Sequence, residues 1–185
     1  MIIHMVWLGN NINQKIIEHT KKINSNCEFM LWINNDLLPK SWINTYNRYA
    51  TIPQLKSDLI RLCALREYGG LYIDFDCFMK INAIEITKNW NNFTIPSLCY
   101  SNILPGNILY CPKEWNYWTY IDNYVINFNS LSTTILTFNH FLYKSLPQEA
   151  YIINNDCEKF PSENQFITDN SQIIRYRTHI PSNIL

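Results

Sequence analysis

Short apolar runs alternate with amphipathic segments through the first half of the chain. The apolar runs at residues 2–7 and 29–33 are rich in β-prone side chains and are followed by Gly-Asn and Asn-Asn turns, which predicts two buried strands. Isoleucines recur at helical spacing over residues 12–23, and a second helix is expected over residues 39–49, where a proline suits the first turn. This alternation predicts an α/β fold with a mostly parallel central sheet.

Residues 55–76, with the sequence LKSDLIRLCALREYGGLYIDFD, hold the strongest local pattern. Leucines spaced three and four apart predict a helix with Ser57 as its N-cap and Asp58 in its first turn. The pair Gly69-Gly70 is expected to end this helix and to turn the chain into a strand. Alternation along that strand predicts one face for the core, and a second face that presents acids, formed by Tyr72, Asp74 and Asp76.

The second half of the chain has weaker periodicity. It predicts strands at residues 95–100, 107–111 and 150–153, helices at 114–127 and 133–145, and a strand-like but irregular end at 173–185. No internal repeat or linker interrupts the sequence. At 185 residues, a single domain over residues 1–185 is expected.

Composition narrows the classes of function. The chain is 47% hydrophobic and 15% aromatic, enough for a real core, and its formal net charge is zero. A broad nucleic-acid surface or ionic attachment to an anionic membrane would need an excess of Lys and Arg, which is absent here. Any bound phosphate must therefore be held locally, by a metal, a helix N-terminus or one or two arginines.

The six cysteines and the N-terminal sequence bear on the compartment. No CxxC pair is present, which disfavours a structural zinc site, and free thiols are expected rather than disulfides. The start MIIHMVWLGN lacks the features of a signal peptide, and no apolar run is long enough to span a bilayer. A cytoplasmic protein is expected.

Asp74 and Asp76 form a DxD pair, the first candidate for chemistry. An isolated DxD is more often a solvated turn at a strand exit. Here it follows a helix, a Gly-Gly stop and an alternating strand, and two neighbouring acids repel each other unless a cation relieves them. Mg²⁺ and Mn²⁺ accept such sparse carboxylates and fill their other positions with phosphate oxygens and water.

Asp58 and Arg61 lie three residues apart, hence on one helix face. Alone they suggest an exposed ion pair worth a few tenths of a kcal/mol. With the strand that follows, they instead suggest contacts to sugar hydroxyls or phosphate. Trp7, at the end of its strand, is either a core residue or a platform for a base, a contact worth about 1–3 kcal/mol. His4, inside the same strand, fits a core histidine better than a ligand.

Taken together, IIHMVWLG followed by SDLIRLCALREYGGLYIDFD resembles the DxD-motif glycosyltransferase family. That family includes initiating α-1,6-mannosyltransferase-like enzymes, capsular sugar transferases and the catalytic domains of the large clostridial glucosylating toxins. The resemblance is strong over about the first 80 residues and loose beyond them. It implies a GT-A (Rossmann-like nucleotide-sugar-binding) fold and retaining transfer of a hexose from a UDP- or GDP-sugar to a glycan or protein acceptor, with Mn²⁺ or Mg²⁺.

The resemblance also implies roles for individual residues. Trp7 would stack on the base, Asp58 and Arg61 would hold the donor sugar, Asp74 would contact ribose or sugar, and Asp76 would bind the metal. The implied catalytic set is Asp58, Arg61, Asp74 and Asp76. The implied donor-binding set is His4, Val6, Trp7, Asp58, Arg61, Tyr72 and Asp74, and the implied metal ligands are Asp76, Asp74 and His179.

The C-terminal segment departs from the family pattern. Thr178-His179-Ile180-Pro181-Ser182-Asn183 has Asn183 where the family has a tryptophan, which weakens the implied roles of His179 and of Ser182 at the leaving group. Asn102 and Asn107 lie in a segment that resembles the family's acceptor-side strand.

Two other functions fit the same sequence. The first keeps the fold, but hydrolyses nucleotide sugars or binds them without turnover. The second is a non-enzymatic interaction module whose contact patch is formed by the aromatic side chains Trp115, Tyr117, Trp118 and Tyr120.

Overall fold

The computed structural model describes residues 1–49, 51–96, 107–128, 142–154, 158–159 and 173–175. Its main feature is a six-stranded sheet in the order β2-β1-β3-β6-β5-β7. These strands are β1 (Ile2–Val6), β2 (Glu28–Trp32), β3 (Gly70–Ile73), β5 (Phe93–Pro96), β6 (Ile108–Cys111) and β7 (Tyr151–Asn154). A smaller sheet in the order β4-β9-β8 consists of β4 (Cys77–Met79), β8 (Glu158–Lys159) and β9 (Ile173–Arg175).

Strand directions confirm the predicted class. The pairs β1–β2, β1–β3 and β5–β7 are parallel, and β6 runs antiparallel to both β3 and β5. Every strand of the large sheet except β6 therefore points the same way. The fold is α/β with a mostly parallel central sheet, as the alternation of strands and helices predicts.

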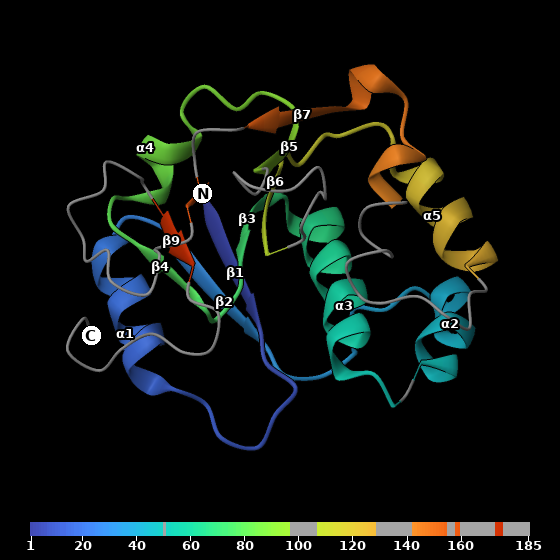
Figure 1. Cartoon of the computed structure of the whole chain (residues 1–185), viewed down its shortest axis with the longest axis horizontal. Helices are drawn as coiled ribbons and strands as arrows, with labels where there is room; N and C mark the ends of the chain where they lie inside the picture. The colour runs from blue at the N-terminus through green and yellow to red at the C-terminus, as the bar shows by residue number, and fades with distance from the viewer. Residues whose placement is uncertain (50, 97–106, 129–141, 155–157, 160–172, 176–185) are drawn as a thin grey trace.

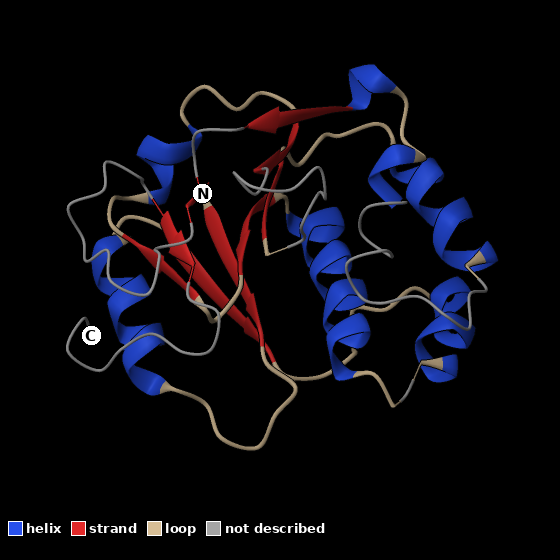
Figure 2. Cartoon of the chain, in the orientation of Figure 1, coloured by secondary structure: helices blue, strands red, loops and turns tan. Residues whose placement is uncertain are grey.

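Helices cover both faces of this sheet (Figures 1 and 2). One side carries α2 (Ile43–Arg48), α3 (Pro53–Tyr68) and α5 (Trp118–Asn127), and the other carries α1 (Gln14–Ile23) and α4 (Ala83–Thr87). Two short 3-10 helices, η1 (Lys40–Trp42) and η2 (Gln148–Ala150), precede α2 and β7. Residues that alternate along a strand belong to two different hydrophobic clusters, one on each face of the sheet. Tyr72 joins the cluster under α3, and Leu71 and Ile73 join the cluster under α1.

Most of the predicted elements are confirmed within a few residues. The predicted strands at 2–7, 29–33, 107–111 and 150–153 correspond to β1, β2, β6 and β7, and the helix at 12–23 corresponds to α1. The helix at 39–49 is split into η1 and α2, and the helix at 114–127 begins only at Trp118. Residues 142–144 are helical, whereas the start of the predicted 133–145 helix and the ends of the 95–100 and 173–185 strands lie outside the described residues.

The prediction of Ser57 as an N-cap is wrong. Helix α3 begins a turn earlier, with Pro53 in its first turn, where the missing N–H of proline costs no helix hydrogen bond. Its predicted end is confirmed, because Gly69 adopts a φ of 65° and its N–H donates to the Leu65 carbonyl at 2.8 Å. Gly70 has a φ of 104°, and a Cβ there would lie 2.3 Å from the Ile2 carbonyl oxygen, so β1 and β3 can pair this closely only around a glycine.

The predicted strand over the DxD pair is wrong in its second half. β3 ends at Ile73, and Asp74, Phe75 and Asp76 form a turn that closes with the Cys77 N–H donating to the Asp74 carbonyl at 3.1 Å. β6 pairs with β3 only as far as Ile73, so alternation in the sequence continues where no neighbouring strand does. The face expected to present acids is covered as well, because Tyr72 is completely buried.

Two further observations concern the cysteines and the length of the helices. The four described cysteines, Cys27, Cys63, Cys77 and Cys111, are free thiols, as predicted. Among the described residues, the structure contains no helix of the length and apolar character that crossing a bilayer requires.

Candidate functional site

Three chain segments meet at one edge of the large sheet. Trp7 follows β1, Asp74 follows the parallel strand β3, and Asn107 directly precedes the antiparallel strand β6. The Asp74 N–H donates to the Asn107 carbonyl at 2.8 Å and joins two of these segments. Ligands of open α/β sheets gather at the carboxyl ends of the parallel strands, so this edge is the expected place for a site.

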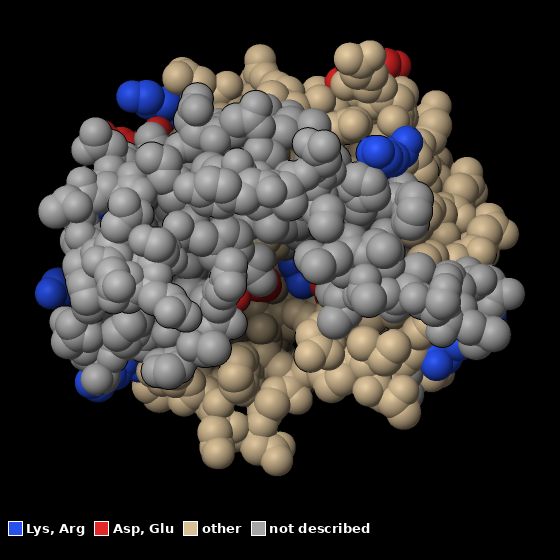
Figure 3. Space-filling view, viewed as in Figure 1, with Lys and Arg blue, Asp and Glu red and all other residues tan. Residues whose placement is uncertain are grey.

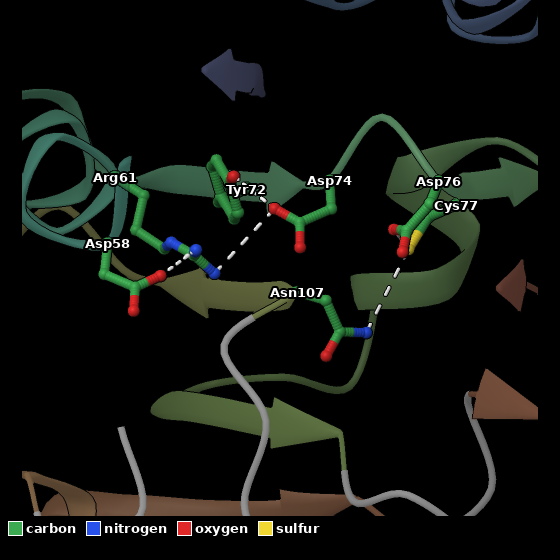
Figure 4. Close-up of polar contacts among 7 residues, drawn as sticks. All are labelled: Asp58, Arg61, Tyr72, Asp74, Asp76, Cys77 and Asn107. Atoms are coloured by element: carbon green, nitrogen blue, oxygen red, sulfur yellow. Dashed lines mark hydrogen bonds and ion pairs between the residues drawn. The ribbon is translucent and has the colours of Figure 1, made fainter. Parts of the chain in front are cut away.

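A cluster of four polar residues lies at this edge: Asp58, Arg61, Tyr72 and Asp74 (Figure 4). Arg61 Nη2 donates to Asp58 Oδ1, Arg61 Nη1 lies 3.8 Å from Asp74 Oδ1, and the Tyr72 hydroxyl donates to the same Asp74 oxygen. The Arg61 guanidinium also lies over the Tyr72 ring, 4.6 Å from its centroid. Figure 3 shows acidic and basic atoms together at the bottom of a hollow in this face of the molecule.

The pair Asp58–Arg61 is deeply buried, which its spacing on a helix does not reveal. Asp58 is 0% exposed and Arg61 is 5% exposed. Burial alone lowers the pKa of the Arg61 guanidinium, but the charges of Asp58 and Asp74 outweigh it and raise the pKa above its usual value, so Arg61 stays protonated. For Tyr72, burial is the largest effect and raises the pKa of the phenol, so its hydroxyl stays protonated and acts as a donor. The cluster therefore holds fixed charges shielded from water.

Asp76 lies apart from this cluster, on the far side of Asp74 from Arg61 (Figure 4). Its Oδ1 accepts a weak hydrogen bond from the Cys77 thiol at 3.5 Å, and Asn107 Nδ2 lies 4.0 Å from the same sulfur. Whereas Asp74 is held by Arg61 and Tyr72, Asp76 lies at the other end of the turn, next to Cys77. The two acids of the DxD pair thus have different surroundings, although the sequence predicts equivalent positions on one strand face.

The donor set suits a hard divalent cation that keeps other ligands. Carboxylate oxygens of Asp76 and Asp74 are the ligand type preferred by Mg²⁺ and Mn²⁺, which take the rest of their coordination from phosphate and water. Among the described residues, no group of three or more His, Cys, Asp or Glu side chains could hold a metal by itself. His179, Ser182, Asn183 and Asn102 lie outside the described residues, so the predicted third ligand stays a prediction.

Trp7 is held at the rim by two neighbours. Its ring lies 4.9 Å from the Phe75 ring, centroid to centroid, and a Cβ at Gly9 would lie 3.1 Å from its indole. Within the described part of the chain, no protein group accepts a hydrogen bond from its buried Nε1. A half-buried indole at a strand end, fixed from two sides, is compatible with the predicted platform for a base.

His4 and Val6 are not brought to the site. Val6 is 6% exposed and belongs to the core cluster under α3. His4 is fully buried, its Nε2 lies 2.7 Å from the Gly69 carbonyl oxygen, and its Nδ1 accepts a hydrogen bond from Trp32 Nε1 at 3.2 Å. Because protein groups engage both ring nitrogens, His4 is placed as a structural histidine, and the structure gives no support for its contact with a donor.

We expect His4 to make the protein less stable in mild acid. Burial lowers its pKa from 6.5 to about 4, only partly offset by the hydrogen bond to the Gly69 carbonyl. The unfolded chain therefore takes up a proton as the pH falls below about 6.5, while folded His4 stays neutral until about pH 4. Stability from this group is complete above that window and falls by about 2–3 kcal/mol on acidification through it.

Urea unfolding at about pH 7 and about pH 4.5 measures this loss. The His4→Phe variant is the control, because it is less stable at neutral pH but lacks the titration. Equal pH dependence in both proteins would contradict the assignment.

The predicted aromatic patch is largely interior. Trp115 is 5% exposed and donates from Nε1 to the Ala150 carbonyl at 2.8 Å, while Tyr117 and Trp118 pack against the core cluster under α3. Only Tyr120, at 47% exposed, is a large exposed aromatic within this set. The core explanation for these residues is therefore the better one, and the interaction-module alternative loses its main support.

Tyr143 is a site residue that the sequence does not indicate. It lies beyond α5, in the helical residues 142–144, and its electrostatic partners include Arg61, Asp58 and Asp74. No motif surrounds it, and Arg61 and Tyr143 are 82 positions apart in the sequence, which hides their proximity. The position of Tyr143 near these charged side chains is visible only in the three-dimensional structure.

Comparison with known proteins places this arrangement in a family. Residues 5–94 match the family model described as the glycosyltransferase sugar-binding region containing the DXD motif. This part of the chain is similar to DXD glycosyltransferase sugar-binding regions. The only DXD sequence within the matched range is Asp74-Phe75-Asp76, the turn described above. The predicted resemblance to this glycosyltransferase family is confirmed.

Two relatives of the DXD region extend the comparison. The chain is 26% identical over 115 residues to inositol phosphoceramide mannosyltransferase 3 of Schizosaccharomyces pombe, an alignment that covers 56% of this chain and 32% of that protein. The chain thus matches about a third of the length of this relative. The solved structure of the PaToxG glycosyltransferase superposes with a TM-score of 0.56 at 17% identity, covering 80% of this chain and 68% of that one, which shows a shared GT-A fold.

Proposed function

We propose that the chain is a metal-dependent, retaining glycosyltransferase that moves a hexose from a UDP- or GDP-sugar to an acceptor hydroxyl. The observation that carries the proposal is the joint placement of Asp58, Arg61, Tyr72 and Asp74 at the carboxyl edge of the sheet, within a DXD sugar-binding region. A protein with zero formal net charge has no broad basic surface, so it needs such a local group of side chains to recognise a sugar attached to a diphosphate.

The buried cluster supplies preorganised contacts to the donor sugar. Asp58 and Asp74 present carboxylate oxygens that accept hydrogen bonds from sugar hydroxyls, and Arg61 forms ion pairs with both acids. Because α3 and β3 fix these side chains before the donor arrives, little orientation entropy is lost on binding. Charges that need no rearrangement in a water-poor site interact strongly with the charge that develops during transfer.

Asp76 and Asp74 are the residues that would hold Mn²⁺ or Mg²⁺ together with the diphosphate. Such a cation, when bound, supplies Lewis-acid stabilisation of the leaving nucleoside diphosphate. The hydrogen bond from Tyr72 and the ion pair with Arg61 orient the carboxylate of Asp74. Trp7, fixed by Phe75, would stack on the base of the nucleotide.

Retention with front-face attack fits the surroundings of these carboxylates. A double displacement needs a carboxylate positioned to form a covalent sugar intermediate. Asp58 is fully buried and paired with Arg61, and Asp74 is held by Arg61 and Tyr72. Both are therefore better suited to binding hydroxyls than to nucleophilic attack. The glycan or protein acceptor and the cytoplasmic location stay predictions from the sequence.

Thermal unfolding with a panel of donors tests the proposal. One of UDP-glucose, UDP-galactose, UDP-N-acetylglucosamine or GDP-mannose is expected to raise the melting temperature in the presence of Mn²⁺ and not in EDTA. A ligand at roughly 100 times its Kd adds about 2.7 kcal/mol of stability, which is easily measured. Absence of any shift across the panel would overturn the proposal. Release of free sugar without an acceptor would instead identify a hydrolase.

A further inference from the structure

Tyr143 carries a hydroxyl group that packing does not explain. Its side chain is 0% exposed, and its ring packs in the core cluster under α3, 6.0 Å from the Phe93 ring, centroid to centroid. Within the described part of the chain, no protein group hydrogen-bonds its hydroxyl. A buried tyrosine usually finds a partner, and a phenylalanine would fill the same space without desolvating a hydroxyl. The hydroxyl is therefore a cost to the ligand-free fold.

The surroundings of this hydroxyl are those of the charged cluster. The pKa of Tyr143 is raised by burial and, to a lesser degree, by Asp58 and Asp74, while the positive charge of Arg61 opposes the rise. Tyr143 in turn contributes to the electrostatic environment of Arg61. The hydroxyl thus lies within electrostatic reach of all three charged side chains, although it comes from a segment far along the chain.

A second unsatisfied polar atom belongs to the same cluster. Arg61 Nε is buried and, among the described residues, has no hydrogen-bond acceptor, although both terminal nitrogens of this guanidinium face carboxylates. A donor on Arg61 and a donor-acceptor on Tyr143, two side chains that interact electrostatically, thus both lack a hydrogen-bond partner among the described residues. Buried polar groups of native proteins are usually hydrogen-bonded, so these two atoms are candidates for contact with a bound ligand.

The charges of the cluster indicate which kind of ligand group would bind these two atoms. Among the described side chains of this cluster, Asp58 and Asp74 carry two negative charges and Arg61 carries one positive charge, so the described cluster is net negative. A phosphate oxygen would be repelled there. A neutral hydroxyl accepts a hydrogen bond from an N–H and exchanges one with a phenol, which matches both unsatisfied atoms.

We propose that the Tyr143 hydroxyl is a donor-binding group that hydrogen-bonds a hydroxyl of the transferred sugar, beside Arg61. This inference rests on the proposed function, because the sugar is that of a nucleotide-sugar donor. It assigns a specificity-determining contact to a residue outside the matched sugar-binding region, from the second half of the chain. The nucleotide itself makes no contact with Tyr143.

Calorimetric binding to the Tyr143→Phe variant of the 185-residue chain tests the contact, since only the hydroxyl is removed. The probes are UDP-glucose, UDP-galactose, UDP-N-acetylglucosamine and GDP-mannose, each compared with UDP or GDP alone, all with Mn²⁺. We expect the variant to bind the preferred nucleotide sugar roughly three- to tenfold more weakly. Affinity for the free nucleoside diphosphate should be unchanged, and the melting temperature of the ligand-free variant should be equal or higher.

Tyr49→Phe is the matched control, because Tyr49 is a buried tyrosine of the same core cluster whose ring packs on Phe128 instead. It should leave the preference for the sugar unchanged. If wild type prefers a nucleotide sugar and Tyr143→Phe keeps that preference in full, the inference fails and the proposed function stands. A lower melting temperature of Tyr143→Phe with unchanged preference would assign the hydroxyl to folding and also overturn the inference. If wild type prefers no nucleotide sugar over its diphosphate, both fail.

Discussion

Asp76→Asn is expected to slow metal-dependent release of nucleoside diphosphate from the preferred nucleotide sugar about a thousandfold, a loss of about 4 kcal/mol in transition-state stabilisation. Asp76 lies on the turn after β3, away from the Asp58–Arg61 pair, and we expect it to be the acid that the diphosphate approaches. An amide keeps the shape of the side chain but removes the charge that a hard cation requires.

The structure indicates that this substitution leaves the fold intact. Asp76 is only partly buried, and its described contact with the Cys77 thiol is a weak one. The melting temperature of the ligand-free variant should therefore match that of wild type. Asp36→Asn, an exposed acid in a loop that accepts a hydrogen bond from Asn34, is the control and should keep full activity. Full activity of Asp76→Asn, or of wild type in EDTA, would refute a metal role for this residue.

Arg61→Leu is expected to destabilise the protein by about 3–5 kcal/mol, because it leaves a buried charge without its partner. Asp58 is 0% exposed and receives its ion-pair contact from Arg61 Nη2, and Asp74 also loses a positive neighbour. Nucleotide-sugar binding should be lost along with this stability. Urea unfolding gives the free energy, with the slope of the transition showing whether the variant still unfolds in one step.

A second ion pair of the same helix gives the matched control. Arg66 pairs with Asp122 of α5, but the side chains are 34% and 22% exposed, and Trp42 Nε1 also donates to Asp122 at 3.0 Å. Arg66→Leu leaves Asp122 a partner and contact with water, so a loss of only about 1 kcal/mol is expected. The double variant Asp58→Leu/Arg61→Leu should regain part of the stability lost by Arg61→Leu while remaining unable to bind donor. Equal losses for Arg61→Leu and Arg66→Leu would show that burial does not set the cost.

Local patterns predicted the elements that carry the site. The apolar run that forms β1, the isoleucine spacing of α1 and the Gly69-Gly70 stop are each contained in a few residues. These local patterns predict the structure correctly because side-chain periodicity and the backbone freedom of glycine act within a single helix, strand or turn. The order of helix, glycine pair and strand also places Asp58, Arg61, Tyr72 and Asp74 close together, since a tight turn joins their elements.

The sequence alone therefore determined the fold class, the family and the short list of acids and aromatics at one sheet edge. The tertiary structure decided that Asp74 and Asp76 lie on a turn with different partners, that the Asp58–Arg61 pair is buried, and that His4 belongs to the core. It alone brought Tyr143 to the cluster. The physical reason is that periodicity reports what one segment prefers, whereas the end of a strand, the depth of a charge and the partner of a hydroxyl depend on which other segments pack against it.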